Sequence, residues 1–237
     1  MRPARVERTR PLPYDAAEAV LALTAADAVL GRLMARVGPF TLRLPAVQSP
    51  FEALVRAILY QQLHGKAAAA IHERMIASFA EVCGAGVHPG AEHLLECPTD
   101  QLRGAGLSHN KVLALRDLAA KTLDGTVPTL AAIRRLSDDE IVERLTAVRG
   151  IGRWTVEMLL IFRLGRPDVL PVDDYGVRKG FALTFQKMKP GTKVTPELLP
   201  KAEVMEKRAR RWAGWRSVAS WYMWRACDLA AADAKTG

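Results

Sequence analysis

The chain has 237 residues, of which 34 are lysine or arginine and 25 are aspartate or glutamate, so its formal net charge is +9 at neutral pH. Hydrophobic residues make up 49% of the chain, which is enough for one large core or two modest cores and excludes global disorder. The basic balance favours an anionic partner. The three cysteines, Cys83, Cys97 and Cys227, lie far apart, which excludes an intrachain disulfide framework and a four-cysteine metal site. We expect a globular protein with reduced thiols.

The N-terminal segment carries Arg2, Arg5, Arg8 and Arg10 but no apolar segment behind them, so a cleaved secretory signal is not expected. No window approaches the roughly 18 consecutive apolar residues that span a membrane. The arginine-rich opening is interpreted as a solvated tail, with an arm that touches phosphate as the alternative. We expect an intracellular protein that is cytoplasmic and associated with the nucleoid if its source is bacterial.

Apolar residues recur at helical spacing almost throughout the chain, and strand-like alternation is nearly absent. The helical stretches lie near residues 16–37, 50–80, 110–123, 138–148, 153–164, 175–185, 196–211 and 215–231. Ser137 followed by Glu140 forms a capping-box pattern. Residues 40–44, before Pro45, are the only candidate for extended structure, as a short connector. The sequence therefore predicts an all-α protein of about eight to ten helices in one or two lobes.

The most informative segment is the Gly150-Ile151-Gly152 turn between two predicted helices. Glycines permit backbone conformations closed to other residues and expose amide groups at the start of the second helix, where the helix dipole favours an anion. Such a turn can grip a phosphate without reading base sequence. Arg149 and Arg153 flank it in a chain of charge +9. We predict binding of a nucleic-acid backbone here, with an ordinary helix–helix turn as the alternative.

The hairpin and four further segments resemble the helix-hairpin-helix superfamily of DNA glycosylases, in which a Gly/Pro-rich loop and an aspartate follow the hairpin. The loop and aspartate correspond to GRPDVLPVDDY at 165–175, and the other segments are ILYQQL at 58–63, GLSHNK at 106–111 and WAGWRS at 212–217. Together they cover about residues 50–231 and look most similar to the alkylpurine (3-methyladenine) glycosylase II branch.

The resemblance implies an all-α helix-hairpin-helix glycosylase fold with two helical lobes and an active-site cleft between them. The lobes are expected at about residues 50–165, and at 1–45 plus 166–237. Residues 1–45 are expected to form an N-terminal arm and a helix that packs on the glycosylase core, residues 46–237.

The resemblance also implies a catalytic aspartate, because a carboxylate near the anomeric carbon stabilises positive charge that develops on the sugar. Ungapped spacing from the hairpin assigns this role to Asp174, whereas the pattern of the endonuclease III branch favours Asp173. One of the two is expected to be only a helix N-cap. Trp154 stands where bifunctional members carry a Schiff-base lysine, which implies a monofunctional hydrolase. We expect it to use no cofactor and no metal.

A base pocket follows from the same resemblance. Trp154 and Trp224 map onto aromatic walls on which a flipped base stacks, and indole rings favour the cationic base produced by alkylation. Met158, one turn after Trp154, is placed in the same pocket, with a core position as the alternative. The other tryptophans, Trp212, Trp215 and Trp221, are interpreted as core residues.

A further candidate is the wedge that fills the space left by a flipped base. It is expected within Gln61, Gln62, Leu63 and His64, and which of these side chains inserts stays open. Lys111 and His109 are expected either to contact the DNA backbone or to lie on a solvated face.

These features predict a monofunctional DNA glycosylase that hydrolyses the N-glycosidic bond of alkylated purines, such as 3-methyladenine and 7-methylguanine, by base flipping during base excision repair. Its partner would be double-stranded DNA with alkylated bases, bound by a monomer away from any membrane. The alternative is a non-catalytic helix-hairpin-helix protein that binds DNA or senses damage and needs no aspartate. The substrate range, the role of residues 1–45 and a structural monovalent ion at the hairpin carbonyls stay open.

Overall fold

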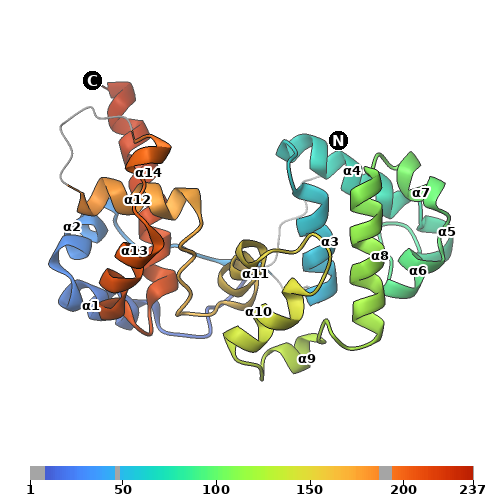
Figure 1. Ribbon diagram of the computed structural model, residues 1–237, viewed down its shortest axis with the longest axis horizontal. Helices are drawn as coiled ribbons and strands as arrows, with labels where there is room; N and C mark the ends of the chain where they lie inside the picture. The colour runs from blue at the N-terminus through green and yellow to red at the C-terminus, as the bar shows by residue number, and fades with distance from the viewer. Residues whose placement is uncertain (1–8, 46–48, 187–193, 237) are drawn as a thin grey trace. The chain divides into compact units, whose positions relative to one another are not determined.

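The computed structural model describes residues 9–45, 49–186 and 194–236 (Figure 1). The chain divides into two compact units. The first unit comprises Met1–Ala46 and Leu160–Gly237, and the second unit comprises Val47–Leu159. Both are built from helices, and this confirms the predicted all-α fold.

The elements of the first unit come from both ends of the chain. They are β1 (Thr9–Arg10), α1 (Ala16–Ala26), α2 (Ala28–Val37), β2 (Leu44–Pro45), a π-helix (Leu160–Leu164), α12 (Tyr175–Phe185), a 3-10 turn (Pro196–Leu198), α13 (Ala202–Ala209), a second 3-10 turn (Arg210–Trp212) and α14 (Arg216–Thr236).

The second unit is formed by one continuous segment. Its elements are α3 (Pro50–Tyr60), α4 (Gly65–Ala77), α5 (Ala80–Cys83), α6 (Ala91–Glu96), α7 (Thr99–Gly104), α8 (His109–Leu123), α9 (Leu130–Ile133), α10 (Asp138–Thr146) and α11 (Arg153–Leu159).

The predicted number of helices is too low, because the described residues contain fourteen α-helices. Four of them, α5, α6, α7 and α9, have only four to six residues, which is too short to show a helical period. The stretch at 16–37 is two helices, since Asp27 ends α1 and its carboxylate caps α2. The capping box of Ser137 and Glu140 is confirmed at the start of α10.

The core of the first unit lies among α1, α2, α12, α13 and α14. Trp212 and Trp221 are buried there and Trp215 packs against it, which confirms their interpretation as core residues. Figure 1 shows α12 against α14. A Cβ at Gly180 of α12 would clash with the carbonyl oxygen of Met223 in α14, so only glycine allows this approach.

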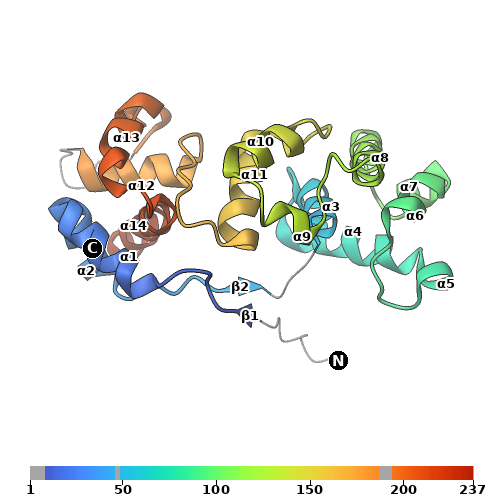
Figure 2. The same ribbon diagram turned by 90° about the horizontal axis from the view of Figure 1, so that it is seen from below.

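The N-terminal strand belongs to the first unit rather than to a solvated tail. β1 pairs with β2 in antiparallel register, with Arg10 opposite Leu44 (Figure 2). The Arg10 guanidinium donates to the carbonyl oxygens of Arg163 at 2.7 Å and Leu164 at 3.3 Å, at the end of the π-helix. The solvated-tail interpretation is therefore wrong for Arg10, while residues 1–8 lie outside the described residues.

The second unit packs around α8, which contacts α3, α6 and α7. Leu115 and Leu118 of α8 are fully buried, as are Leu54 and Leu59 of α3. In the part of the chain that the structure describes, no helix has the length and apolar character needed to cross a membrane.

Candidate functional site

The Gly-x-Gly turn lies between α10 and α11, as predicted. Gly150 has φ +78°, a left-handed conformation that favours glycine. Ile151 is buried and anchors the turn in the second unit. Gly152 is exposed, and its carbonyl oxygen accepts from the amides of Thr155 and Val156 in the first turn of α11. The turn therefore leaves backbone exposed at the start of α11, where the helix dipole favours an anion.

Two side chains hold the backbone of this turn. The Asp117 carboxylate accepts from the Arg149 amide at 2.6 Å and from the Lys121 ammonium at 2.7 Å. The Gln61 amide nitrogen donates to the Gly150 carbonyl oxygen at 2.8 Å. Burial raises the pKa of Asp117, but the bonds from Arg149 and Lys121 outweigh it and hold that pKa below its usual range. Sequence reasoning missed Asp117, whose only signal was its i,i+4 pairing with Lys121.

The two arginines at the turn differ in their surroundings. Arg149 is exposed. The Arg153 guanidinium lies 3.0 Å from a carboxylate oxygen of Glu157, one turn later in α11, and Glu157 is buried. Glu157 was not predicted, and a lone glutamate at this spacing carries no specific signal for a functional role.

The predicted wedge segment forms the loop between α3 and α4. Gln62 has φ +57°, and it is the only non-glycine residue with positive φ in the described part of the chain. Leu63 is 39% exposed although it is apolar, and His64 is exposed at the start of α4. Gln61 differs from these three because its side chain already contacts the hairpin. We call residues 61–64 the wedge loop.

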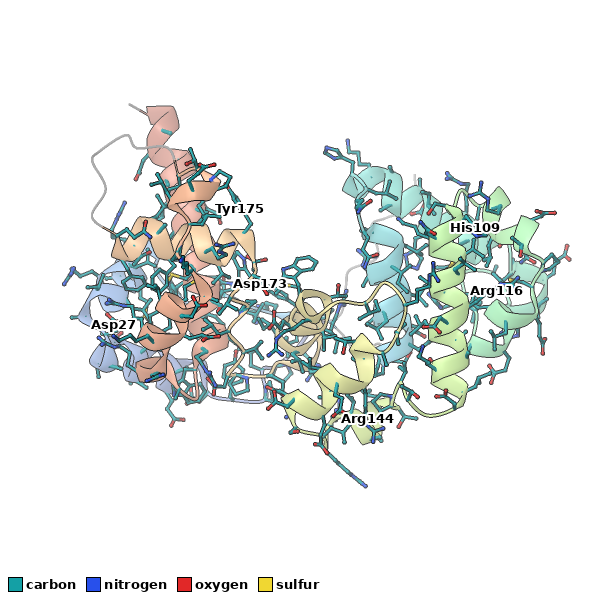
Figure 3. The ribbon with its side chains drawn as sticks, in the orientation of Figure 1. Asp27, His109, Arg116, Arg144, Asp173 and Tyr175 are labelled. Carbon is teal, nitrogen blue, oxygen red and sulfur yellow. The ribbon has the colours of Figure 1, made fainter. Side chains whose placement is uncertain are left out.

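The middle segment places its two basic residues differently. The Lys111 ammonium donates to the Leu59 carbonyl oxygen in the last turn of α3 at 2.6 Å, and burial lowers the pKa of Lys111. His109 is exposed at the start of α8, where Figure 3 labels it. Lys111 is thus a structural contact within the second unit, and only His109 lies on a solvated face.

The predicted pocket residues of α11 share one face of the helix. Trp154 is 48% exposed, and Met158, four residues later, is half-buried. An indole ring with this much exposed surface is unusual for a core residue.

Asp174 is the N-cap of α12 and is only 9% exposed. One of its carboxylate oxygens accepts from the Val177 amide at 2.8 Å and from the Trp224 indole N–H at 2.8 Å. Asp173 is exposed in the preceding turn (Figure 3). The local cap signal and the catalytic candidate therefore fall on the same residue.

Trp224 of α14 is held close to Asp174 by its neighbours in the first unit. Its ring centroid lies 5.3 Å from that of Phe162. A Cβ at Gly176 would lie 2.6 Å from Trp224 Cδ1, so glycine is needed at this position of α12. The structure brings together two predicted residues, Asp174 and Trp224, that are 50 positions apart in the chain.

Two residues at the start of α14 hold the Gly/Pro-rich loop that precedes Asp174. Arg216 forms two bonds of 2.7 Å with the Asp168 carboxylate. The buried Ser217 hydroxyl accepts from the Val169 amide at 2.9 Å and donates to the Arg166 carbonyl oxygen at 2.7 Å. Burial raises the pKa of Asp168, but Arg216 outweighs it and holds that pKa below its usual range. These contacts were not predicted, although both segments carry the family resemblance.

The described residues contain no group of three or more histidine, cysteine, aspartate or glutamate side chains that could hold a metal ion. Each unit offers its own groups for chemistry: the hairpin has an exposed backbone and exposed arginines, and the start of α12 has a buried carboxylate beside an indole.

Comparisons with known proteins agree with these features. The family model for HhH-GPD superfamily base excision DNA repair proteins matches residues 55–202. The chain is 36% identical over 226 residues to DNA-3-methyladenine glycosylase 1 of Schizosaccharomyces pombe, covering 95% of this chain and 93% of that protein. It is 30% identical over 208 residues to DNA-3-methyladenine glycosylase 2 of Escherichia coli, covering 84% and 64%.

Solved structures of two glycosylases are also similar to this chain. A crystal structure of a DNA-3-methyladenine glycosidase from Bacillus halodurans matches with a TM-score of 0.74 and 28% identity over 92% of each chain. The Schizosaccharomyces pombe 3-methyladenine DNA glycosylase in complex with abasic DNA matches with a TM-score of 0.70 and 36% identity, covering 88% of this chain and 95% of that one.

Proposed function

Because the chain belongs to the HhH-GPD superfamily of base excision DNA repair proteins, we propose that it is a monofunctional DNA glycosylase that excises alkylated purines from duplex DNA. The relatives that it matches along most of its length are named for 3-methyladenine, which supports this substrate class. The observation that carries the proposal is Asp174, a buried carboxylate held by two donors beside an indole ring.

Asp174 is the catalytic residue in this proposal. As the bond between the sugar and the base breaks, the base leaves with the electron pair and positive charge develops on the sugar, which a fixed carboxylate stabilises. The oxygen of a water molecule then forms a bond to the anomeric carbon and loses a proton to solvent. Alkylation at N3 or N7 makes the purine cationic, so the base leaves as a neutral molecule and modest catalysis suffices.

Trp154 supports hydrolysis without a covalent intermediate. A Schiff base with the sugar needs a primary amine, and an indole cannot supply one. The product would then be free base and an intact abasic site, without strand cleavage.

Base recognition is assigned to Trp154, Trp224 and Met158. Aromatic faces stack on an extruded base, and attraction between a cation and an indole ring is worth about 0.5 to 2 kcal/mol, which favours the alkylated purine over the normal one. The Trp224 N–H, at the edge of the ring, donates to Asp174. The face of the ring is therefore the part that would stack on a base.

Duplex binding is assigned to two regions of the second unit. The backbone of Gly150 and Gly152, with Arg149 and Arg153, would hold a phosphate. The wedge loop, residues 61–64, would fill the space left by the flipped base. In this proposal the protein is intracellular, cytoplasmic and associated with the nucleoid if its source is bacterial, and it acts as a monomer.

The test is product analysis with a panel of duplexes that carry methylated, deaminated and oxidised bases. We expect release of free 3-methyladenine and 7-methylguanine, with no strand cleavage until the abasic site is treated with alkali. Tight binding without release of any base would refute the enzyme and favour a protein that only binds or senses damaged DNA.

A further inference from the structure

We propose that Gln61 is a positioning residue that connects the wedge loop to the hairpin at residues 149–152. In this proposal, side chains of α8 hold both segments in place. The proposal rests on the proposed function, because it assigns to Gln61 a task within duplex recognition. It concerns only contacts inside the second unit.

Side chains of α8 hold both segments. Lys111, Ala114 and Asp117 are spaced by three residues, so each is a neighbour of the next on the helix surface. The Lys111 ammonium binds the Leu59 carbonyl oxygen at 2.6 Å, just before the wedge loop begins. The Asp117 carboxylate binds the Arg149 amide at 2.6 Å, where the hairpin begins. Both bonds involve a charged side chain, and such bonds are the stronger kind.

The middle one of these three residues, Ala114, packs against the turn. Ala114 is buried, and a Cβ at Gly150 would lie 3.6 Å from the Ala114 Cβ, which is ordinary packing distance. A larger residue at 114 would push the turn away from the helix. The hairpin thus rests on α8 through both a hydrogen bond and a packing contact.

Gln61 forms a direct hydrogen bond between the wedge loop and the hairpin. Its amide nitrogen donates to the Gly150 carbonyl oxygen at 2.8 Å, across 89 positions of sequence. The following residues of the loop, Gln62, Leu63 and His64, are exposed. The loop therefore has one side chain that points to the protein and three that are available to a duplex.

This arrangement matters when DNA is bound at a damaged site. Contacts to phosphates alone suffice for an undamaged duplex. At a flipped or missing base, the wedge must enter the duplex while the hairpin holds a phosphate, so the spacing of the two segments must match that of the DNA. A fixed spacing avoids the entropy of ordering the loop during binding. The Gln61 bond should therefore contribute to affinity for damaged DNA and little to affinity for undamaged DNA.

The principal experiment compares Gln61→Met with Gln101→Met. Methionine keeps the length of the side chain and removes the donor. Gln101 makes the same kind of bond in the same unit, from its amide nitrogen to the Ser78 carbonyl oxygen at 2.8 Å, away from both segments. The measurement is the Kd for a duplex with a tetrahydrofuran abasic analogue and for the same duplex without it.

We expect Gln61→Met to weaken binding of the abasic duplex about fivefold, which corresponds to the loss of one hydrogen bond, and to leave binding of the undamaged duplex within twofold. Gln101→Met should change neither Kd, while both variants lose a similar amount of thermal stability. Equal weakening of both duplexes by Gln61→Met, or no weakening of either, would overturn the proposal.

A double-mutant cycle with Leu63→Ala separates positioning from direct contact with DNA. If Gln61 acts by holding the wedge loop, Gln61→Met should weaken the abasic complex less than twofold once Leu63 has been truncated. A full fivefold effect in the Leu63→Ala background would show that Gln61 contacts DNA independently, contrary to the proposal.

The contact between α8 and the hairpin is tested through Asp117. Asp117→Asn retains an acceptor for the Arg149 amide and should bind both duplexes almost as the wild type does. Asp117→Leu should weaken both and lower the magnitude of the salt dependence by about 0.9 for a lost phosphate contact. Unchanged binding in Asp117→Leu would refute the role of α8. Because these are binding measurements, failure of the proposed function shows separately, as wild-type protein that releases no base.

Discussion

The hairpin and the start of α12 differ in what the structure holds in place. At the hairpin, Arg149 and Gly152 are exposed, and what is fixed is the backbone, held by Asp117 and Gln61. At the start of α12, what is fixed is one side chain, the buried Asp174, held by its own helix and by Trp224. The hairpin therefore presents an exposed backbone and several charges, whereas the start of α12 presents a single buried carboxylate.

This difference predicts how each region responds to substitution. In the proposed function, the hairpin would contact phosphates through exposed groups whose charges are screened by salt, so each contact should contribute little. A carboxylate in a buried site acts at lower effective dielectric and has no substitute, so its loss should affect the rate most.

The largest effect is expected from Asp174→Asn. It should lower the rate of base release under single-turnover conditions by about 10²- to 10³-fold, the range seen when one electrostatic group of a site is removed. Asparagine is an N-cap as good as aspartate, so the melting temperature should change little. Asp173→Asn, at the exposed neighbour, is the control and should remain active. The reverse result would transfer the catalytic role to Asp173.

Gly180→Ala should have the next largest effect, on stability. The added Cβ would clash with the backbone of Met223, and such overpacking costs about 3 kcal/mol. Urea unfolding measures this loss. Gly104→Ala is the control, because a Cβ there meets nothing within 4 Å. If the free energy of unfolding falls by less than 1 kcal/mol, the contact of α12 with α14 is not as close as described.

A smaller effect is expected from Trp224→Phe, which keeps an aromatic ring and removes the N–H that binds Asp174. A hydrogen bond to a charged group is worth about 1.5 to 3 kcal/mol, so base release should slow at least tenfold while binding of an abasic duplex changes less. Equal losses in rate and binding would indicate that Trp224 acts mainly through stacking.

The smallest effect is expected from Arg149→Gln at the hairpin. Loss of one phosphate contact should reduce the magnitude of the slope of log K against log salt by about 0.9 and leave the rate at saturating enzyme near that of the wild type. Asp174→Asn should leave the slope unchanged. A change in rate without a change in slope would contradict the separation of the two regions.

The sequence was most informative where the signal is local. Helical periods located all the long helices, and the capping box of Ser137 and Glu140 was read directly from its spacing. The family resemblance is confirmed by the family model and by the relatives along the chain. The short helices α5, α6, α7 and α9 were missed because four to six residues do not complete enough turns to show a period.

What the sequence determined by itself is the class of fold, the family, and the residue types at the hairpin and at the start of α12, because these depend on local spacing. Only the tertiary structure decided which partners hold them: Asp117 and Gln61 on the hairpin, Trp224 on Asp174, and Arg216 on Asp168. Such contacts join residues 32 to 89 positions apart, and a hydrogen bond between distant residues leaves no periodic trace in the sequence. These contacts form because the packing of the buried helix faces fixes the position of each polar side chain.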